Sequence, residues 1–387
     1  MTLASGLAGD AFGPVLESFL LSFLTSVCVG GALVWFYNRY LTNLRESYLK
    51  KGVSLSILPV AIVAGAAHFA AMRLGYPVIN GFAAVGAVIF LLSGVTYIRR
   101  IQFNRDSRLV RGQTRERAID HRALPAPVSA FLKLISPINE VDRLQILRRE
   151  VVIEGLHADM DGYRILFLTD LHVHKWMRKE FYNAVIAEAL SLKADAILLG
   201  GDYVSKPYCC DMAADAMQAL KQHPRVIAVR GNHDFWTRPS YFAEMMKKIG
   251  AELLTNSAAT LRRGAGEVAL IGLESPYIPL TMRESFEIEA KLPAGVPRIG
   301  IVHTPQVYGD AERLGCQLAF AGHTHGGQVR LPFFGTTLAA CSVSALHSWG
   351  CGRLGRMMTI TSNGIGAFYP LRFLCPPQII EVTMRRG

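Results

Sequence analysis

The chain has 387 residues, more than one ordinary domain needs, so two or more folding units are expected. Its residues are 51% hydrophobic, and its seven cysteines contain no Cys-x-x-Cys pair, which argues against a disulfide framework. The net charge of +11 arises mainly in residues 1–150, which hold 17 Lys and Arg against 9 Asp and Glu, and this uneven distribution argues against a nucleic-acid-binding face.

Three segments near the N-terminus contain no Asp, Glu, Lys or Arg. They cover residues 18–38, 52–72 and 74–98 and hold 21, 21 and 25 residues, whereas about 20 apolar residues cross a bilayer. Basic residues follow the first and the third segment, so the positive-inside rule predicts that these connections lie in the cytoplasm. We therefore expect residues 1–98 to form a multi-pass anchor of about three transmembrane helices, followed by a cytoplasmic domain.

Residues 99–149 are predicted to be a basic juxtamembrane linker. Eight arginines lie between residues 99 and 122, and two prolines follow at 125 and 127. Two interpretations remain open for the arginines. They are either topology signals on a solvated segment or a contact with anionic lipid headgroups, which contributes about 1 kcal/mol per basic residue.

From residue 150 onward, short β-branched runs alternate with amphipathic segments, and we expect one folded domain over residues 150–387. Two strands, 151–154 and 163–168, are predicted to pair through a turn at Asp161-Gly162. Further strands are expected at 196–200, 225–229, 268–271, 298–302, 318–321, 357–361 and 378–383, and helices at 179–193, 211–221 and 239–249. This pattern predicts a layered α/β domain with more than one sheet.

Metal-ligating side chains stand where many of these strands end. The candidates are Asp170, His172, Asp202, Asn232, His303, His323 and His325. Seven oxygen and imidazole donors suit two divalent ions held side by side, and a carboxylate such as Asp202 can bridge them. His233, next to Asn232, is left free for proton transfer. This set predicts a hydrolase of phosphate esters or anhydrides.

The motif order Asp-x-His, Gly-Asp, Gly-Asn-His-Asp, His and Gly-His-Thr-His resembles that of the calcineurin-like metallophosphoesterases, over roughly residues 164–384. The resemblance implies a four-layer α/β/β/α sandwich with two divalent ions (Mn, Zn or Fe, with Mn favoured) at the strand ends. It implies one ion on Asp170, His172, Asp202 and His325, and the other on Asp202, Asn232, His303 and His323. A hydroxide between the ions would attack phosphorus, with His233 as the catalytic imidazole and Asp234 supporting it.

Residues 322–335 and 370–382 are similar to a membrane-associated bacterial branch of this family, which includes UDP-2,3-diacylglucosamine diphosphatases of lipid A biosynthesis. The similarity implies a lipid-linked or nucleotide diphosphate as substrate, at the cytoplasmic face of a bacterial inner membrane. The alternatives are a phosphodiesterase or phosphomonoesterase acting on another envelope or nucleotide metabolite, and a non-catalytic membrane sensor. The presence of His233 argues against the sensor, because ligand binding alone needs no proton-transfer group.

Overall fold

The structure, a computed structural model of the chain, describes residues 9–36, 48–76, 83–88, 90, 91, 95, 109–118, 138–174, 177, 179–274, 281–331, 335, 336, 347–367 and 370–387. Its contacts divide the chain into two compact units. One unit consists of residues 1–99 and 332–338, and the other of residues 100–331 and 339–387.

The first unit contains the helices α1 (Gly9–Phe36) and α2 (Tyr48–Arg73). The two helices pack closely at Gly65, where an added Cβ would lie 1.9 Å from the Ser26 Oγ. Ser22 Oγ lies 3.2 Å from His68 Nδ1 across the same contact. Small and hydroxyl-bearing residues are typical of tightly packed membrane helices.

One stretch among the described residues, Pro14–Leu33 in α1, is long and apolar enough to cross a membrane. Within α2, Pro59–Arg73 forms a shorter apolar helix. Of the third predicted span, residues 83–88, 90, 91 and 95 are helical, and much of the remainder lies outside the described residues. The N-terminal region is therefore helical, with one candidate membrane span.

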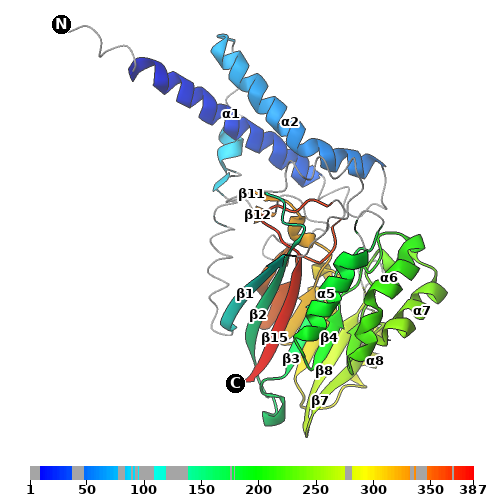
Figure 1. Cartoon of the computed structure of the whole chain (residues 1–387). Helices are drawn as coiled ribbons and strands as arrows, with labels where there is room; N and C mark the ends of the chain where they lie inside the picture. The colour runs from blue at the N-terminus through cyan, green and yellow to red at the C-terminus, as the bar shows by residue number, and fades with distance from the viewer. Residues whose placement is uncertain are drawn as a thin grey trace. The chain divides into compact units, whose positions relative to one another are not determined.

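The second unit is built on two mixed β-sheets (Figure 1). The first sheet has seven strands in the order β1 (Leu109–Ala118), β2 (Arg143–Ile153), β15 (Gln378–Arg386), β3 (Arg164–Leu168), β4 (Ala196–Leu199), β5 (Val226–Ala228) and β6 (Ala251–Leu253). The second has six strands in the order β13 (Gly350–Leu354), β14 (Met357–Thr361), β10 (Leu318–Ala321), β9 (Arg298–Val302), β8 (Gly266–Leu273) and β7 (Ser257–Arg263). Two further short strands are β11 (Arg330–Leu331) in this unit and β12 (Gly335–Thr336) in the first unit.

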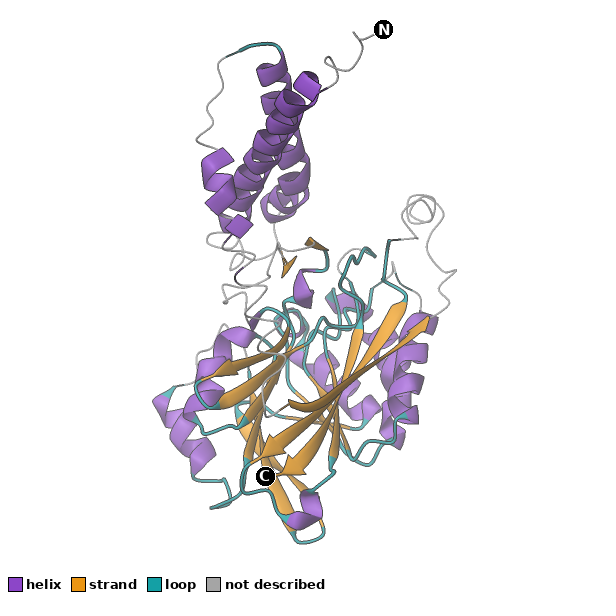
Figure 2. Ribbon diagram, turned by 90° about the vertical axis from the view of Figure 1, so that its left-hand side faces the viewer, coloured by secondary structure: helices purple, strands orange, loops and turns teal. Residues whose placement is uncertain are grey.

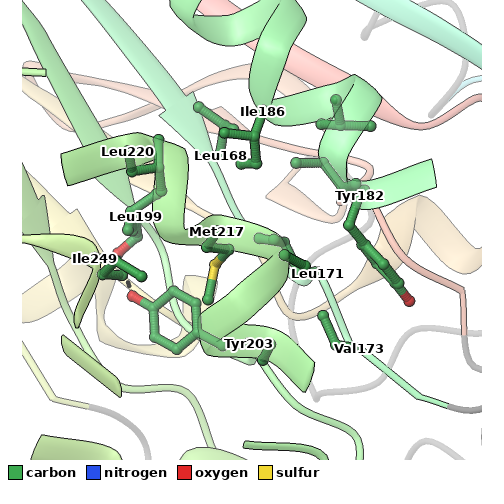
Figure 3. Close-up of a cluster of buried hydrophobic side chains, with 14 of the residues drawn as sticks. Leu168, Leu171, Val173, Tyr182, Ile186, Leu199, Tyr203, Met217, Leu220 and Ile249 are labelled. Atoms are coloured by element: carbon green, nitrogen blue, oxygen red, sulfur yellow. Dashed lines mark hydrogen bonds between the residues drawn. The ribbon is translucent and has the colours of Figure 1, made fainter. Parts of the chain in front are cut away.

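Helices lie on both outer sides of the sheet pair (Figure 2). Buried side chains of α5 (Lys179–Ser191), α6 (Cys210–Met217) and α7 (Pro239–Ile249) join those of β3, β4 and β5 in one core, part of which is drawn in Figure 3. A second core lies between the sheets, and a third lies between the six-stranded sheet and the helices α8 (Met282–Glu289) and α9 (Tyr308–Arg313). The predicted α/β/β/α layering is therefore confirmed.

The predicted hairpin between residues 151–154 and 163–168 is wrong. β2 is longer than predicted, and β15 lies between β2 and β3, parallel to β2 and antiparallel to β3. The Asp161-Gly162 turn exists, but Gly162 N–H donates to the carbonyl of Met384 in β15. The connection from β2 to β3 is therefore a crossover that leaves room for the C-terminal strand.

Part of the expected linker is folded into this sheet. β1 and most of β2 fall within residues 99–149, and β2 pairs with β1 on one side and β15 on the other. Val141, Leu144, Ile146 and Leu147 from this region are buried. The sheet therefore begins before residue 150.

We predict that a fragment of residues 150–387 does not fold stably, whereas a fragment of residues 138–387 does. The shorter fragment lacks four buried apolar side chains worth about 2 kcal/mol each, a total similar to the 5–15 kcal/mol stability of a whole domain. Thermal unfolding followed by circular dichroism tests this. Equal melting temperatures for the two fragments would contradict it.

Candidate metal centre

All seven candidate ligands lie at the carboxyl ends of parallel strands. Asp170 and His172 follow β3, Asp202 follows β4 and Asn232 follows β5 in one sheet; His303 follows β9, and His323 and His325 follow β10, in the other. β3, β4 and β5 are mutually parallel, as are β9 and β10, so the loops of each sheet emerge at one edge. The two edges meet, because His303 Nε2 lies 3.0 Å from Asn232 Oδ1.

The backbone holds five of these residues in the left-handed region. The φ angles are 53° at Asp170, 44° at His172, 54° at Asp202, 66° at His323 and 51° at His325. Non-glycine residues rarely adopt this conformation, and each instance costs of order 1 kcal/mol. Such a concentration at one site indicates that the loops are shaped for side-chain placement rather than for backbone stability.

Two glycines allow the loops to approach each other. A Cβ at Gly201 would lie 2.5 Å from the Gly231 amide nitrogen and 2.8 Å from His303 Nδ1. A Cβ at Gly231 would lie 2.2 Å from Asp202 Oδ1. The hypothetical Cβ atom at Gly201 is too close to His303, and the one at Gly231 is too close to Asp202, for any real Cβ atom. Only glycine therefore fits at positions 201 and 231.

The first cluster consists of Asp170, His172 and His325. Asp170 Oδ1 lies 3.9 Å from His172 Nε2 and 3.6 Å from His325 Nε2. His325 Nδ1 is buried, and no hydrogen-bond partner lies near it among the described residues. The first cluster can hold a metal ion, since its ligand atoms all lie within 4.8 Å of one another.

The second cluster consists of Asp202, His303 and His323, with Asn232 beside it. His303 Nε2 lies 3.1 Å from His323 Nδ1 and 3.3 Å from Asp202 Oδ2. The same Oδ2 atom lies 3.3 Å from His172 Nε2 of the first cluster. One carboxylate oxygen of Asp202 therefore faces both clusters.

The second cluster has the donor chemistry of a cation site. His303 Nδ1 lies 2.8 Å from the Gly200 carbonyl oxygen, which can only accept, so Nδ1 carries the hydrogen. In the neutral ring, Nε2 then presents a lone pair toward Asn232 Oδ1 and Asp202 Oδ2. Lone pairs that face one another in a buried space require a proton or a metal ion between them. The donor atoms of the second cluster therefore fit a divalent metal ion.

The surroundings of Asp170 and Asp202 in the metal-free site shift the pKa values of the two carboxylates in opposite directions. Burial raises the pKa of Asp170; the charge of His303 opposes this rise, and that of Asp202 adds to it. Burial also favours the protonated form of Asp202, but His303, His233 and hydrogen bonds from His172 and His303 hold its pKa well below the usual value. Asp202 is therefore the ionised carboxylate at the centre of the site.

His233 lies against Asp202 and has one ring nitrogen occupied. Its backbone N–H donates to Asp202 Oδ1 at 2.8 Å. Its Nδ1 lies 3.2 Å from the Ser205 carbonyl oxygen and must carry a hydrogen to donate to it. Nε2 is then the atom that can exchange a proton. The ring centroid lies 4.7 Å from that of His172 and 4.3 Å from that of Trp236.

Asp234 fastens two loops together through its carboxylate. It accepts hydrogen bonds from the backbone N–H groups of Asp202 at 2.7 Å, Gly231 at 2.8 Å and Tyr203 at 3.1 Å. Burial and the charge of Asp202 raise the pKa of Asp234 to about 7. These contacts indicate that Asp234 positions the Asp202 loop.

Ser205 is a residue that sequence reasoning missed. Besides its carbonyl contact with His233, its hydroxyl donates to the His172 carbonyl at 3.0 Å and lies 3.4 Å from His172 Nδ1. His174, which also follows β3, bonds the Ala367 carbonyl through Nε2 at 2.9 Å. A serine in a loop has no motif of its own, so only the folded geometry identifies Ser205.

Parts of the chain are similar to known proteins. A family model described as calcineurin-like phosphoesterase matches residues 163–327. The chain is 30% identical over 231 residues to the phosphodiesterase YaeI of Escherichia coli, covering 57% of this chain and 81% of the relative. It is 23% identical to a zebrafish transmembrane protein with metallophosphoesterase domain, covering 67% and 62%. A crystal structure of the Bacillus subtilis calcineurin-like phosphoesterase YfkN aligns at 12% identity and TM-score 0.37, covering 52% and 81%.

We predict that metal binding releases protons and tightens as the pH rises to about 9. Burial alone would lower the pKa of His303, but the charge of Asp202 and its hydrogen bond outweigh this and raise the pKa to about 9. Metal-free His303 is thus protonated at neutral pH, and a cation must displace that proton. Affinity is expected to rise up to about tenfold per pH unit and to level off above this pKa.

Titration calorimetry in buffers of different ionisation enthalpy measures the protons released. Binding without proton release at pH 7, or an affinity independent of pH between 6 and 9, would contradict the assignment of His303 as a protonated group displaced by the cation.

Proposed function

The chain belongs to the calcineurin-like phosphoesterase family, and we propose that it is a membrane-anchored hydrolase that cleaves phosphodiesters with two divalent ions. The observation that carries this proposal is the position of Asp202 Oδ2, 3.3 Å from His172 Nε2 and 3.3 Å from His303 Nε2. A single oxygen shared by two buried ligand clusters is what a pair of neighbouring cations requires.

The proposed ligands follow from the two clusters. One ion would be held by Asp170, His172, Asp202 and His325, and the other by Asp202, Asn232, His303 and His323. Such a pair of ions supplies Lewis-acid polarisation of the phosphoryl oxygens and activates the attacking water. Manganese, zinc and iron are the proposed metals, because mixed imidazole and oxygen donors accept all three, and manganese is the one we propose to test first.

His233 is the proposed proton donor. Its Nδ1–H is engaged by the Ser205 carbonyl at 3.2 Å, so a proton carried on Nε2 can pass to the departing oxygen of the substrate. The backbone contact with Asp202 Oδ1 keeps the ring beside the proposed bridging carboxylate. Asp234 contributes by fastening the loops that carry Asp202 and Gly231.

The substrate class is proposed from two sources. The Escherichia coli relative is named a phosphodiesterase, which supports a phosphodiester. The motif similarity at residues 322–335 and 370–382 supports a lipid-linked or nucleotide diphosphate, with UDP-2,3-diacylglucosamine of lipid A biosynthesis as the sharpest candidate. Both share a phosphorus atom with an alkoxy or phosphoryl leaving group, so the same site chemistry serves either one.

The proposed membrane arrangement is a multi-pass anchor of about three helices in residues 1–98, followed by a basic segment at 99–149 and a catalytic domain at 150–387. The basic segment also supplies β1 and most of β2 to the sheet of that domain. Support comes from the candidate span Pro14–Leu33 and from the transmembrane naming of the zebrafish relative. The arginines of residues 99–122 favour a cytoplasmic catalytic domain at a bacterial inner membrane.

We predict that His233→Ala lowers kcat by about 10²–10⁴ for a diester with an alkoxy leaving group. The loss should be much smaller for an aryl diester, because nitrophenolate departs without a proton. His157→Ala, at an exposed histidine, is the matched control. Steady-state kinetics on both substrates, with metal content measured, test this. Equal losses of kcat on the two substrates would show that His233 is not the proton donor.

We further expect the Mn²⁺-loaded protein to hydrolyse bis(4-nitrophenyl) phosphate, which a phosphodiesterase accepts. Incubation with UDP-2,3-diacylglucosamine then distinguishes the two substrate classes by release of UMP. UMP formation supports the lipid-linked diphosphate. Aryl diester hydrolysis without UMP formation eliminates UDP-2,3-diacylglucosamine, and inactivity on both compounds contradicts the proposed function.

A further inference from the structure

Arg372 is a fully buried arginine that binds the backbone next to the first ligand cluster. Its guanidinium donates to the carbonyl oxygens of Cys375 at 3.0 Å and Asn363 at 3.0 Å, and also to those of Gly364 and Gly366. Among the described residues, no carboxylate forms an ion pair with Arg372, and its side chain has 0% relative exposure. A buried charge bonded to so many carbonyls fixes the backbone that carries them.

The backbone that Arg372 holds lies directly against the Asp170 loop. Gly366 N–H donates to the Asp170 carbonyl at 2.7 Å, and Ile365 N–H donates to the Thr169 carbonyl at 3.1 Å. A Cβ at Gly364 would lie 2.7 Å from the Asp170 Cβ. Displacement of residues 364–366 would therefore displace Asp170.

Arg330 connects the same segment to the His325 loop. It donates through Nε to the Gly326 carbonyl at 3.0 Å, through Nη1 to the Leu374 carbonyl at 3.2 Å, and through Nη2 to Asn363 Oδ1. The guanidinium carbon lies 3.7 Å from the Trp349 ring centroid. A planar guanidinium that donates hydrogen bonds through three nitrogens and stacks on an aromatic ring has little freedom to move.

Three more contacts complete the connection. Cys375 Sγ lies 3.1 Å from the His325 carbonyl oxygen, which it donates to. Asn139 Oδ1 accepts from Arg372 N–H at 2.9 Å, and Glu140 Oε2 accepts from Cys375 N–H at 2.6 Å. Residues 363–375 are thus bonded to the loops of Asp170 and His325 on one side and to the segment before β2 on the other.

The second cluster is held by different groups. His303 bonds the Gly200 carbonyl, and Asp202 is placed by the Asp234 carboxylate. Neither of these contacts involves Arg330, Arg372 or residues 363–375. His303 and Asp202 therefore have supports of their own, whereas His323 shares the loop of His325 and donates its N–H to the Asp170 carboxylate at 2.9 Å.

We propose that Arg330 and Arg372 are positioning residues for the Asp170–His172–His325 cluster and thereby set the affinity of the metal ion at this cluster more strongly than that of the other ion. This inference rests on the proposed two-ion function. It assigns the C-terminal segment 363–375 a task in metal binding, although that segment contains none of the proposed ligands.

The test measures Mn²⁺ binding to the full-length protein and to the variants Arg372→Lys and Arg330→Lys. Each lysine keeps the charge but loses the fork that joins several carbonyls. Titration calorimetry gives the affinity for each ion, and electron paramagnetic resonance detects the spin-coupled Mn²⁺ pair. We expect one affinity to fall at least tenfold while the other changes less than threefold, and the coupled signal to appear only at correspondingly higher Mn²⁺.

Arg385→Lys is the matched control, because Arg385 pairs with Glu150 at 3.0 Å in an ion pair at the end of β15 and touches neither cluster. Circular dichroism establishes which variants fold. If Arg372→Lys does not fold, Arg330→Lys and Cys375→Ala carry the test, since each removes a connection between residues 363–375 and the His325 loop.

The outcomes separate the inference from the proposed function. Wild-type protein that binds fewer than two Mn²⁺ ions contradicts the proposed function itself. Wild-type protein that binds two ions, with folded variants that keep both affinities or lose both equally, overturns the positioning role and leaves the two-ion function standing.

Discussion

The convergence of imidazole nitrogens from both sheets on Asp202 Oδ2 is the constraint on which the rest of the catalytic domain depends. Two imidazole nitrogens from different sheets lie 3.3 Å from that oxygen. In a buried space such an arrangement is unfavourable until a positive charge occupies it. The two-sheet architecture brings the carboxyl ends of β3, β4, β5, β9 and β10 to one place, and this is what allows the donors to converge.

Several less favourable local features make sense as consequences of this convergence. Five of the candidate ligands have positive φ, and glycines at 201 and 231 leave no room for a side chain. The structure compensates with groups that hold backbone rather than metal. The Asp234 carboxylate gathers three N–H groups around the Asp202 loop, while Arg372 gathers carbonyls beneath the Asp170 loop. The Asp234 carboxylate thus stabilises backbone N–H groups, and the Arg372 guanidinium stabilises backbone carbonyl groups.

The candidate ligands could be predicted from the sequence because each follows an apolar strand directly, so that a local pattern specifies its place. The strand limits at 298–302 and 318–321 were also predicted correctly for the same reason. Contacts between residues far apart in the sequence could not be predicted. The insertion of β15 between β2 and β3 depends on pairing between residues more than 200 positions apart, as does the contact of Asn139 with Arg372. Asp234 illustrates the same limit, since its carboxylate bonds the backbone N–H groups of Tyr203 and Gly231, which only the folded loops bring together.

Anomalous diffraction from crystals of the Mn²⁺-loaded protein determines whether two cations share Asp202. We expect two anomalous peaks per chain, about 3.5–4 Å apart, with the Asp202 carboxylate between them and one cluster on each side. A single peak, or two peaks that leave Asp202 uncoordinated, would contradict this expectation.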